Sequence, residues 1–397
     1  KYKDGSDPDN YPNVNHLKWL LESGSGFQHQ HNVSIQGGNA TTSYNLSIGY
    51  RNQEGLTAKT SNERMTALFS LRSQLSKSLT LSLNINAYNN KYNAPNGEPT
   101  SIDGIIGYAV REAPIYAGQK SDGSFGYQDN YSPEAWLASE SFVENVSRNI
   151  NASGQLRWDT PIKGLSLTGK AGVTYWTKYD KTYRAETYFD ENKTVGPSTL
   201  NIWTSNNTNT ILEALVNYEK TFGSHDLKVL AGTSVEQTSN KGLEGYRNTF
   251  PNNALYQLGA GDASTATNNS SLEEYALVSF FGRVNYAFKD KYLLEANLRY
   301  DGSSRFAKDN RWGIFPSVSA GWRISEENFW KNTRAGEVVN NLKLRASYGV
   351  LGNQNIGVYP YQQTYDLDHN YPLGNPATLV PGTYVSTYRN QDLTWEK

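Results

Sequence analysis

The chain is dominated by short stretches in which apolar and polar residues alternate. In LTLSLNINA (79–87) every second residue is Leu, Ile or Ala, and small polar residues separate them. Successive side chains of a strand point to opposite faces, so this pattern predicts a strand with one apolar face and one polar face. The alternation recurs about a dozen times. The other stretches that show it are 29–38, 41–52, 65–73, 148–159, 165–176, 211–222, 226–237, 275–289, 292–306, 313–325 and 342–352.

The lengths of these stretches point to a membrane rather than to an ordinary globular sheet. Many contain about 10–14 residues, against five or six in a typical strand. That length is sufficient to cross a bilayer at a tilt. Helical periodicity is scarce, and the segment from Glu326 to Lys331 is the only short helix that we predict.

The connections between the predicted strands alternate in length. Tight turns rich in Gly, Ser, Asn and Lys alternate with long polar segments at about 90–146, 178–209 and 238–271. The link 326–341 is the exception, since its place in the order predicts a short turn. Short turns at one end and long loops at the other are typical of outer-membrane β-barrels.

Composition excludes several other classes of protein. Hydrophobic residues make up 37 % of the chain and the mean hydropathy is −0.67. No apolar run reaches the length of about 18 residues that a transmembrane helix needs. An aromatic content of 13 % is too high for a disordered polar chain. Cysteine is absent, which removes disulfides and thiolate chemistry. The net charge of −1 gives no reason to expect a nucleic-acid partner.

The apolar faces could contact lipid, or they could close on each other in a soluble sandwich. Aromatic residues near the predicted strand ends favour lipid, because an interfacial girdle needs them there. These residues are Trp158, Tyr175, Tyr218, Tyr286, Phe288, Tyr300 and Trp322. We therefore predict an all-β fold, a transmembrane antiparallel up-and-down β-barrel, of which the chain holds about 12 strands.

Four segments carry a family resemblance. They are HNVSIQGGNATTSYNLSIGYRNQEG (31–55), KDKYLLEANLRYDGSSRFAKDNRWGIFPSVSAGWRISEENF (289–329), LKLRASYGVLGNQNIG (342–357) and RNQDLTWEK (389–397). In this order they resemble the barrel of SusC/RagA-type TonB-dependent outer-membrane transporters. The resemblance implies active transport of oligosaccharides or peptides across the bacterial outer membrane, energised through TonB. It also implies a SusD-like surface lipoprotein as partner and outer-membrane lipid around the barrel.

The departures from the family pattern are specific. No plug domain and no TonB-contacting segment are recognisable in 1–397, and about 12 strands are fewer than the roughly 22 of such a barrel. We therefore expect a partial barrel that lacks the plug and C-terminal strands. Near the start, Asn15-His16 stands where the family usually has Asp-Trp. Two alternatives remain, a soluble secreted all-β carbohydrate-binding protein and a passive porin.

Two groups of residues are the candidates for function. Charged residues on the polar side of the strands between 275 and 352 either fix the register of the wall or contact a plug: Arg283, Glu295, Arg299, Arg323, Lys343 and Arg345. Aromatic residues of the first long loop either contact ligand or lid, or pack the loop: Tyr108, Tyr116, Tyr127, Tyr131 and Trp136. Flat aromatic rings among amides and carboxylates suit contact with a glycan.

We expect neither catalysis, nor a cofactor, nor a metal site. Glu326 and Glu327 are adjacent, so their carboxylates should point apart, which disfavours a paired-carboxylate glycosidase. His29 and His31 share a strand face, but a metal site needs a third ligand.

Overall fold

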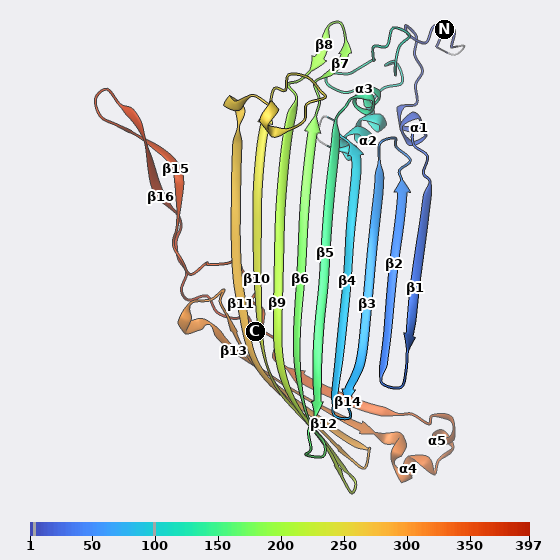
Figure 1. The fold of residues 1–397 in the computed structure, drawn as a ribbon, viewed down its shortest axis with the longest axis vertical. Helices are drawn as coiled ribbons and strands as arrows, with labels where there is room; N and C mark the ends of the chain where they lie inside the picture. Colours follow the sequence, from blue (N-terminus) through green and yellow to red (C-terminus); the bar gives the residue numbers. More distant parts are fainter. Residues whose placement is uncertain (3–4, 98–100) are drawn as a thin grey trace.

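A computed structural model describes residues 1–2, 5–97 and 101–397. One twelve-stranded antiparallel sheet dominates it, in the order β1-β2-β3-β4-β5-β6-β9-β10-β11-β12-β13-β14 (Figure 1). Each strand pairs with the next large strand along the chain, so the sheet is an up-and-down meander, with β1 and β14 at its edges. Its strands are β1 (Gln28–Gly38), β2 (Thr42–Glu54), β3 (Ser61–Ser76), β4 (Leu79–Pro95), β5 (Phe142–Asp159), β6 (Leu165–Arg184), β9 (Thr199–Phe222), β10 (His225–Asn248), β11 (Thr267–Phe288), β12 (Tyr292–Ser303), β13 (Trp312–Arg323) and β14 (Lys343–Gly349).

Two small hairpins and several short helices complete the described residues. The hairpins are β7 (Thr187–Asp190) with β8 (Lys193–Val195), and β15 (Thr364–Leu373) with β16 (Thr378–Thr387). The α-helices are α1 (His16–Leu21), α2 (Ile102–Arg111), α3 (Pro133–Ala138), α4 (Asn328–Lys331) and α5 (Arg334–Val338). The 3-10 helices are η1 (Leu258–Ala260), η2 (Ala263–Thr265), η3 (Lys308–Asn310) and η4 (Ile324–Glu326). No helix among the described residues is both long and apolar enough to cross a membrane.

The strand register collects the apolar residues on one face of the large sheet. Val284 of β11 lies opposite Ala296 of β12, and Ala296 lies opposite Val318 of β13. Val318 in turn lies opposite Tyr348 of β14. These side chains stay exposed: 42 % of Val284, 45 % of Val318 and 75 % of Tyr348. A continuous exposed apolar face suits contact with lipid.

The soluble sandwich requires two sheets whose apolar faces pack together. Among residues 1–2, 5–97 and 101–397, the large sheet is accompanied by two two-stranded hairpins only. The apolar face therefore has no second sheet against it within these residues, and the sandwich alternative is wrong for this part of the chain.

The predicted sorting of connections by length is confirmed, but the loop boundaries were wrong. Tight turns lie at the lower end of the sheet in Figure 1 and the long connections at the upper end. The segments 90–146, 178–209 and 238–271 shrink to 96–141, 185–198 and 249–266, because the strands on both sides are longer than expected. Towards these strand ends the apolar side chains no longer form one exposed face: Tyr183 of β6 and Leu200 of β9 lie opposite each other and are 0 % exposed, although the ladder continues.

The exceptional link between β13 and β14 lies at the same end as the tight turns (Figure 1). It holds η4, α4 and α5, and the predicted helix from Glu326 to Lys331 coincides with η4 and α4. Helices α1, α2 and α3 were not predicted. They cluster at the opposite end of the sheet, near the upper ends of β1 to β5 (Figure 1).

One cluster of fully buried side chains lies outside the sheet, in what we call the loop cap: residues 16–21, 101–138 and 187–195. Leu20, Ile105, Trp136 and Phe189 are each 0 % exposed, and all four belong to one hydrophobic cluster. They come from α1, α2, α3 and β7. The cap therefore has a core of its own, formed by segments far apart in the sequence.

Candidate functional site

Two helices of the loop cap begin at serine caps. The Ser101 side chain accepts a hydrogen bond from the backbone N–H of Gly104 at the start of α2. Ser132 does the same for Ala135 at the start of α3, where Pro133 occupies the first turn. Such caps satisfy amide groups that the first turn leaves free. They fix where α2 and α3 begin, and so where their side chains point.

The cap brings two of the predicted loop aromatics together. The rings of Tyr108 and Tyr131 are stacked, with centroids 3.8 Å apart and an angle of 20° between their planes. They line a pocket of about 240 Å³ with Arg111, Glu112 and Gln128. The pocket thus combines flat aromatic surface with a guanidinium, an amide and a carboxyl group.

The other three predicted aromatics lie elsewhere in the cap. Trp136 is 0 % exposed in the core, and its indole Nε1–H donates to the carbonyl of Asn130 at 3.0 Å. Tyr127 packs on Phe189, and Tyr116 is half-buried beside the chain turn at Ala113. Trp136 therefore supports the cap from inside and offers no surface to a ligand in this arrangement.

A buried polar cluster lies next to that pocket. Nδ1 of His16, the first residue of α1, is 2.7 Å from Oε1 of Glu134 in α3 and 3.9 Å from Oε2 of Glu112. Glu112 directly follows α2. The side chains of His16 and Glu112 are 1 % exposed and that of Glu134 is 2 % exposed. One ligand atom from each of the three residues lies within 4.8 Å of the other two.

Burial and mutual charge shift the pKa values in this cluster. Burial raises the pKa of Glu112 to about 8; the charge of His16 opposes the shift and that of Glu134 adds to it. For His16, burial by itself lowers the pKa. The hydrogen bond to Glu134 and the negative charges of Glu134 and Glu112 outweigh burial, so the pKa of His16 is raised.

The six predicted charged residues share one face of the sheet. All six have odd residue numbers. In the register of β11 to β14, odd-numbered residues lie opposite odd-numbered residues, on the face opposite to the apolar row of Val284, Ala296, Val318 and Tyr348. A hollow of about 460 Å³ lies on this face, and Glu295, Lys343 and Arg345 line it. Glu295, Lys343 and Arg345 therefore share one hollow on the polar face of the sheet.

These charges differ in the partners that they have. Arg299 Nε lies 2.6 Å from Asp301 Oδ2, and Arg299 Nη2 donates to Ser279 Oγ at 2.7 Å. Glu295 accepts from Asn297 at 2.9 Å, and Arg323 lies 3.8 Å from Asp290. Arg283, Lys343 and Arg345 have no ion pair within residues 1–2, 5–97 and 101–397. Arg299 thus joins β11 and β12 through Ser279. Arg283, Lys343 and Arg345 form no ion pair of this kind in the described residues.

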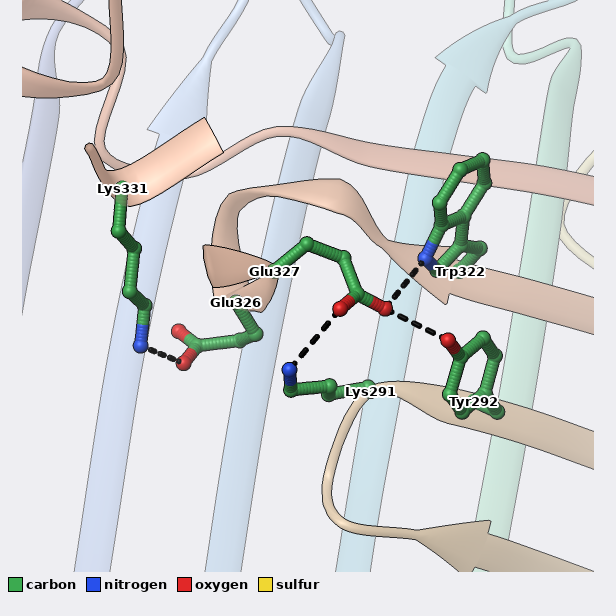
Figure 2. A network of polar contacts seen from close by, with 6 residues as sticks. All are labelled: Lys291, Tyr292, Trp322, Glu326, Glu327 and Lys331. Atoms are coloured by element: carbon green, nitrogen blue, oxygen red, sulfur yellow. Dashed lines mark hydrogen bonds and ion pairs between the residues drawn. The ribbon is translucent and has the colours of Figure 1, made fainter. Parts of the chain in front are cut away.

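Glu326 and Glu327 point to different partners at the opposite end of the sheet. Figure 2 shows Glu327 accepting hydrogen bonds from Lys291 at 3.0 Å, Tyr292 at 2.7 Å and Trp322 at 3.2 Å. Glu326 pairs with Lys331 at 2.6 Å. Bonds from Tyr292, Lys291 and Trp322 lower the pKa of Glu327 to about 2. The two carboxylates do not converge, so they form no paired-carboxylate site.

A comparison with models of known protein families identifies the family of this chain. Residues 72–397 match the model described as "TonB dependent receptor-like, beta-barrel". The chain belongs to this TonB-dependent receptor β-barrel family. Its long strands, its apolar outer face and its sorted connections are those of a bacterial outer-membrane barrel.

Named relatives agree with the family match. The TonB-dependent receptor SusC of Bacteroides thetaiotaomicron is 29 % identical over 92 % of this chain and 38 % of its own length. The TonB-dependent receptors P26 and P3 of Formosa agariphila are 30 % and 29 % identical, over 98 % and 92 % of this chain. The chain spans 36–39 % of the length of these relatives.

Solved structures show the same fold. The structure of the RagAB peptide transporter matches 98 % of this chain and 43 % of the solved chain, with a TM-score of 0.80 and 24 % identity. A "closed-closed" state of the RagAB peptide importer matches with a TM-score of 0.76. The resemblance to SusC/RagA-type barrels is thereby confirmed.

The cluster of His16, Glu112 and Glu134 was not predicted from the sequence. The one signal in the sequence was the Asn15-His16 pair, which departs from the Asp-Trp pair that the family resemblance implies. Glu112 and Glu134 carry no local pattern, because helix packing across more than a hundred residues brings them to His16. The histidine pair for which the sequence disfavoured a metal site, His29 and His31, lies on β1 with 3.2 Å between ring nitrogens. No third ligand accompanies that pair in the described part of the chain.

Proposed function

We propose that this chain is the wall and loop cap of an active importer of oligosaccharides or peptides, energised through TonB. The observation that carries the proposal is the two-faced sheet: an exposed apolar face, and an opposite polar face that bears charged residues. The family membership and the likeness to SusC and to RagAB support it. The action is binding and gated passage, without covalent chemistry.

The pocket at Tyr108 and Tyr131 is the proposed ligand contact in the loop cap. The two rings present apolar faces that suit the C–H surface of a sugar ring or an apolar peptide side chain. Arg111, Gln128 and Glu112 supply donors and acceptors around them. Of the two classes of ligand, we propose oligosaccharides first, because hydroxyl groups match this mixture of amide, carboxyl and guanidinium groups.

The upper ends of the strands and the cap are the proposed contact for a SusD-like lipoprotein. The relative named SusC and the RagAB complex motivate this partner. On the inner face, Arg283, Lys343 and Arg345 are the proposed contacts for a plug, since they extend into the hollow or beside it without an ion pair in the described residues.

The test is uptake by cells that express the full-length protein. Tyr108→Ala and Tyr131→Ala should lower uptake of the ligand, whereas Tyr188→Ala is the matched control: Tyr188 is also in the cap, is 54 % exposed and does not line the pocket. A panel of labelled oligosaccharides and peptides identifies the class of ligand. Deletion of TonB should abolish uptake. Uptake that persists without TonB would support the passive porin instead.

A further inference from the structure

The His16, Glu112 and Glu134 cluster places three metal-ligating side chains at one buried point. Each comes from a different helical segment: α1, the end of α2, and the first turn of α3. The three helices contact one another, and the hydrophobic core of the cap lies beside them. The position of the ligand atoms is therefore fixed by packing and does not depend on the solvent-exposed loops.

The cluster leaves buried oxygen atoms without partners. Neither carboxyl oxygen of Glu112 has a hydrogen-bond partner among the described residues, and Oε2 of Glu134 has none there either. Nδ1 of His16 contacts the other oxygen of Glu134 at 2.7 Å and lies 3.9 Å from Oε2 of Glu112. No lysine or arginine pairs with Glu112 or Glu134 there either. Leaving a buried carboxylate unpaired is costly, so such a group is usually neutralised by a proton, by a cation or by a bound ion.

The donor set selects the class of ion. One imidazole nitrogen and two carboxylate groups suit a divalent first-row transition metal, and Zn²⁺ in particular. Calcium and magnesium prefer oxygen ligands only. We propose that His16, Glu112 and Glu134 bind one such ion, with Zn²⁺ as the best fit, and that this ion ties α1, α2 and α3 together at the base of the loop cap.

The geometry needs little movement to accept the ion. Ligand atoms around a tetrahedral zinc ion are about 3.3 Å apart, given bonds of about 2.0–2.1 Å. His16 Nδ1 now lies 2.7 Å from Glu134 and 3.9 Å from Glu112, one separation below that value and one above it. Binding of the ion would require both carboxyl groups to rotate, so that one separation lengthens and the other shortens towards that value. Two carboxylates and a neutral imidazole then balance the charge of the ion.

A tetrahedral ion would need a fourth ligand besides the three side chains. Glu112 belongs both to the cluster and to the lining of the pocket under the Tyr108–Tyr131 pair. Both carboxyl oxygens of Glu112 are buried, so a small movement of this side chain would have to admit the water molecule that completes a tetrahedral site with the three protein ligands. The ion's role here is structural, because it joins segments that are 118 residues apart at their extremes.

The first experiment measures metal in the full-length protein, purified in detergent without chelators and without a polyhistidine tag. Inductively coupled plasma mass spectrometry should find about one more Zn²⁺ per chain in the wild type than in His16→Gln or Glu134→Gln. His31→Gln is the matched control, since His31 is an exposed histidine on β1. Loss of the ion in His31→Gln but not in His16→Gln would overturn the proposal.

The second experiment titrates Zn²⁺ into protein stripped with a chelator. His16→Gln should weaken binding by at least about 100-fold, above the range for groups that merely orient a ligand. Heat-modifiable migration in SDS gels verifies that each variant barrel is folded. Equal zinc content and equal affinity in the wild type and in both cluster variants would sink the proposal, and would mean that protons or water satisfy these carboxylates.

Proteolysis gives a readout of the structural role. Chelation should speed tryptic cleavage after Arg111 and Lys120 in the wild type, because the three helices then separate more easily. The same treatment should leave cleavage of His16→Gln unchanged, since that variant lacks the ion already. If chelation changes both proteins equally, the ion does not act through this cluster.

Discussion

Nδ1 of His16 lies 2.7 Å from Oε1 of Glu134, although 118 residues separate the two along the chain. Two strand hairpins and a long loop lie between them, yet both side chains are almost fully buried. The contact shows that the loop cap is a packed structure and not a set of independent loops. Its stability should therefore be separable from that of the barrel wall.

Truncation of the cap core should loosen the cap and leave the wall intact. Trp136→Ala removes a fully buried side chain and should destabilise the cap by about 3–5 kcal/mol. Hydrogen exchange should increase in peptides from 101–138 and stay unchanged in β9 to β12. Val110→Ala is the control, because Val110 on α2 is 63 % exposed. Equal protection in Trp136→Ala and wild type would contradict a shared core.

A charge on the apolar face should prevent assembly, while the same charge one residue away should not. Val318→Arg places a cation on the exposed apolar row, at a cost of about 2–4 kcal/mol if the site is near the bilayer midplane. Ser319→Arg points to the polar face, directly opposite Glu295. We expect a lower folded fraction in the outer membrane for Val318→Arg alone. Equal folded fractions in heat-modifiability gels would argue against a lipid-facing row.

Replacing charged residues of the inner face should lower stability where the residue has an ion pair and leave stability unchanged where it has none. Arg299→Gln leaves Asp301, whose side chain is 9 % exposed, without its ion pair, and should lower stability by about 1–3 kcal/mol. Arg283→Gln breaks no ion pair in the described residues and should leave stability unchanged. If Arg283 contacts a plug, its loss should make cells more sensitive to large antibiotics such as vancomycin. Urea unfolding in detergent and inhibition assays measure the two effects, and a stability loss in Arg283→Gln would contradict this expectation.

The Glu327 network should make the link between β13 and β14 sensitive to acid. The folded pKa of Glu327, about 2, lies below its ordinary value of 4.5, so its ionised form is stabilised by folding. This contribution is complete above about pH 4.5 and is lost as the pH falls towards 2. Glu327→Gln keeps an acceptor for Tyr292 and Trp322 but removes the charge.

The wild type should therefore have a higher apparent Tm than Glu327→Gln at pH 7, and the difference should shrink as the pH falls from 4.5 towards 2. Thermal unfolding in detergent at a series of pH values measures it. Glu326→Gln is the comparison, since Glu326 contacts Lys331 alone among the groups of Figure 2. A difference that stays constant down to pH 2 would rule out ionised Glu327 as its source.

Alternation along the strands was sufficient to predict the wall. Leu294, Leu298 and Val318 repeat at the period of a strand, and that period survives because one face must meet lipid and the other water. The same pattern placed Arg283, Glu295 and Arg345 on a common face, which the strand register confirms. The tight turns also predicted the order of the strands, because in an antiparallel meander each strand pairs with the next strand along the chain.

The residues at which the strands end, and the helices of the loop cap, could not be predicted from alternation. Strands β9 and β10 continue to Thr199 and Asn248, and there Leu200 is buried in a cluster with Tyr183 and Phe250 instead of lying on the exposed apolar face. Helices α1 and α3 have six residues each, too few for a helical period to stand out. They are stabilised by tertiary packing around Trp136 rather than by their own propensity.

The sequence by itself therefore determined a two-faced wall of about a dozen strands, because the membrane imposes a local, periodic constraint on every strand. Tertiary structure alone decided that Trp136 is core rather than surface, that Tyr108 stacks on Tyr131, and that His16 meets Glu112 and Glu134. Those contacts join segments distant in the chain, and no local period encodes them. They exist because three short helices share one buried core.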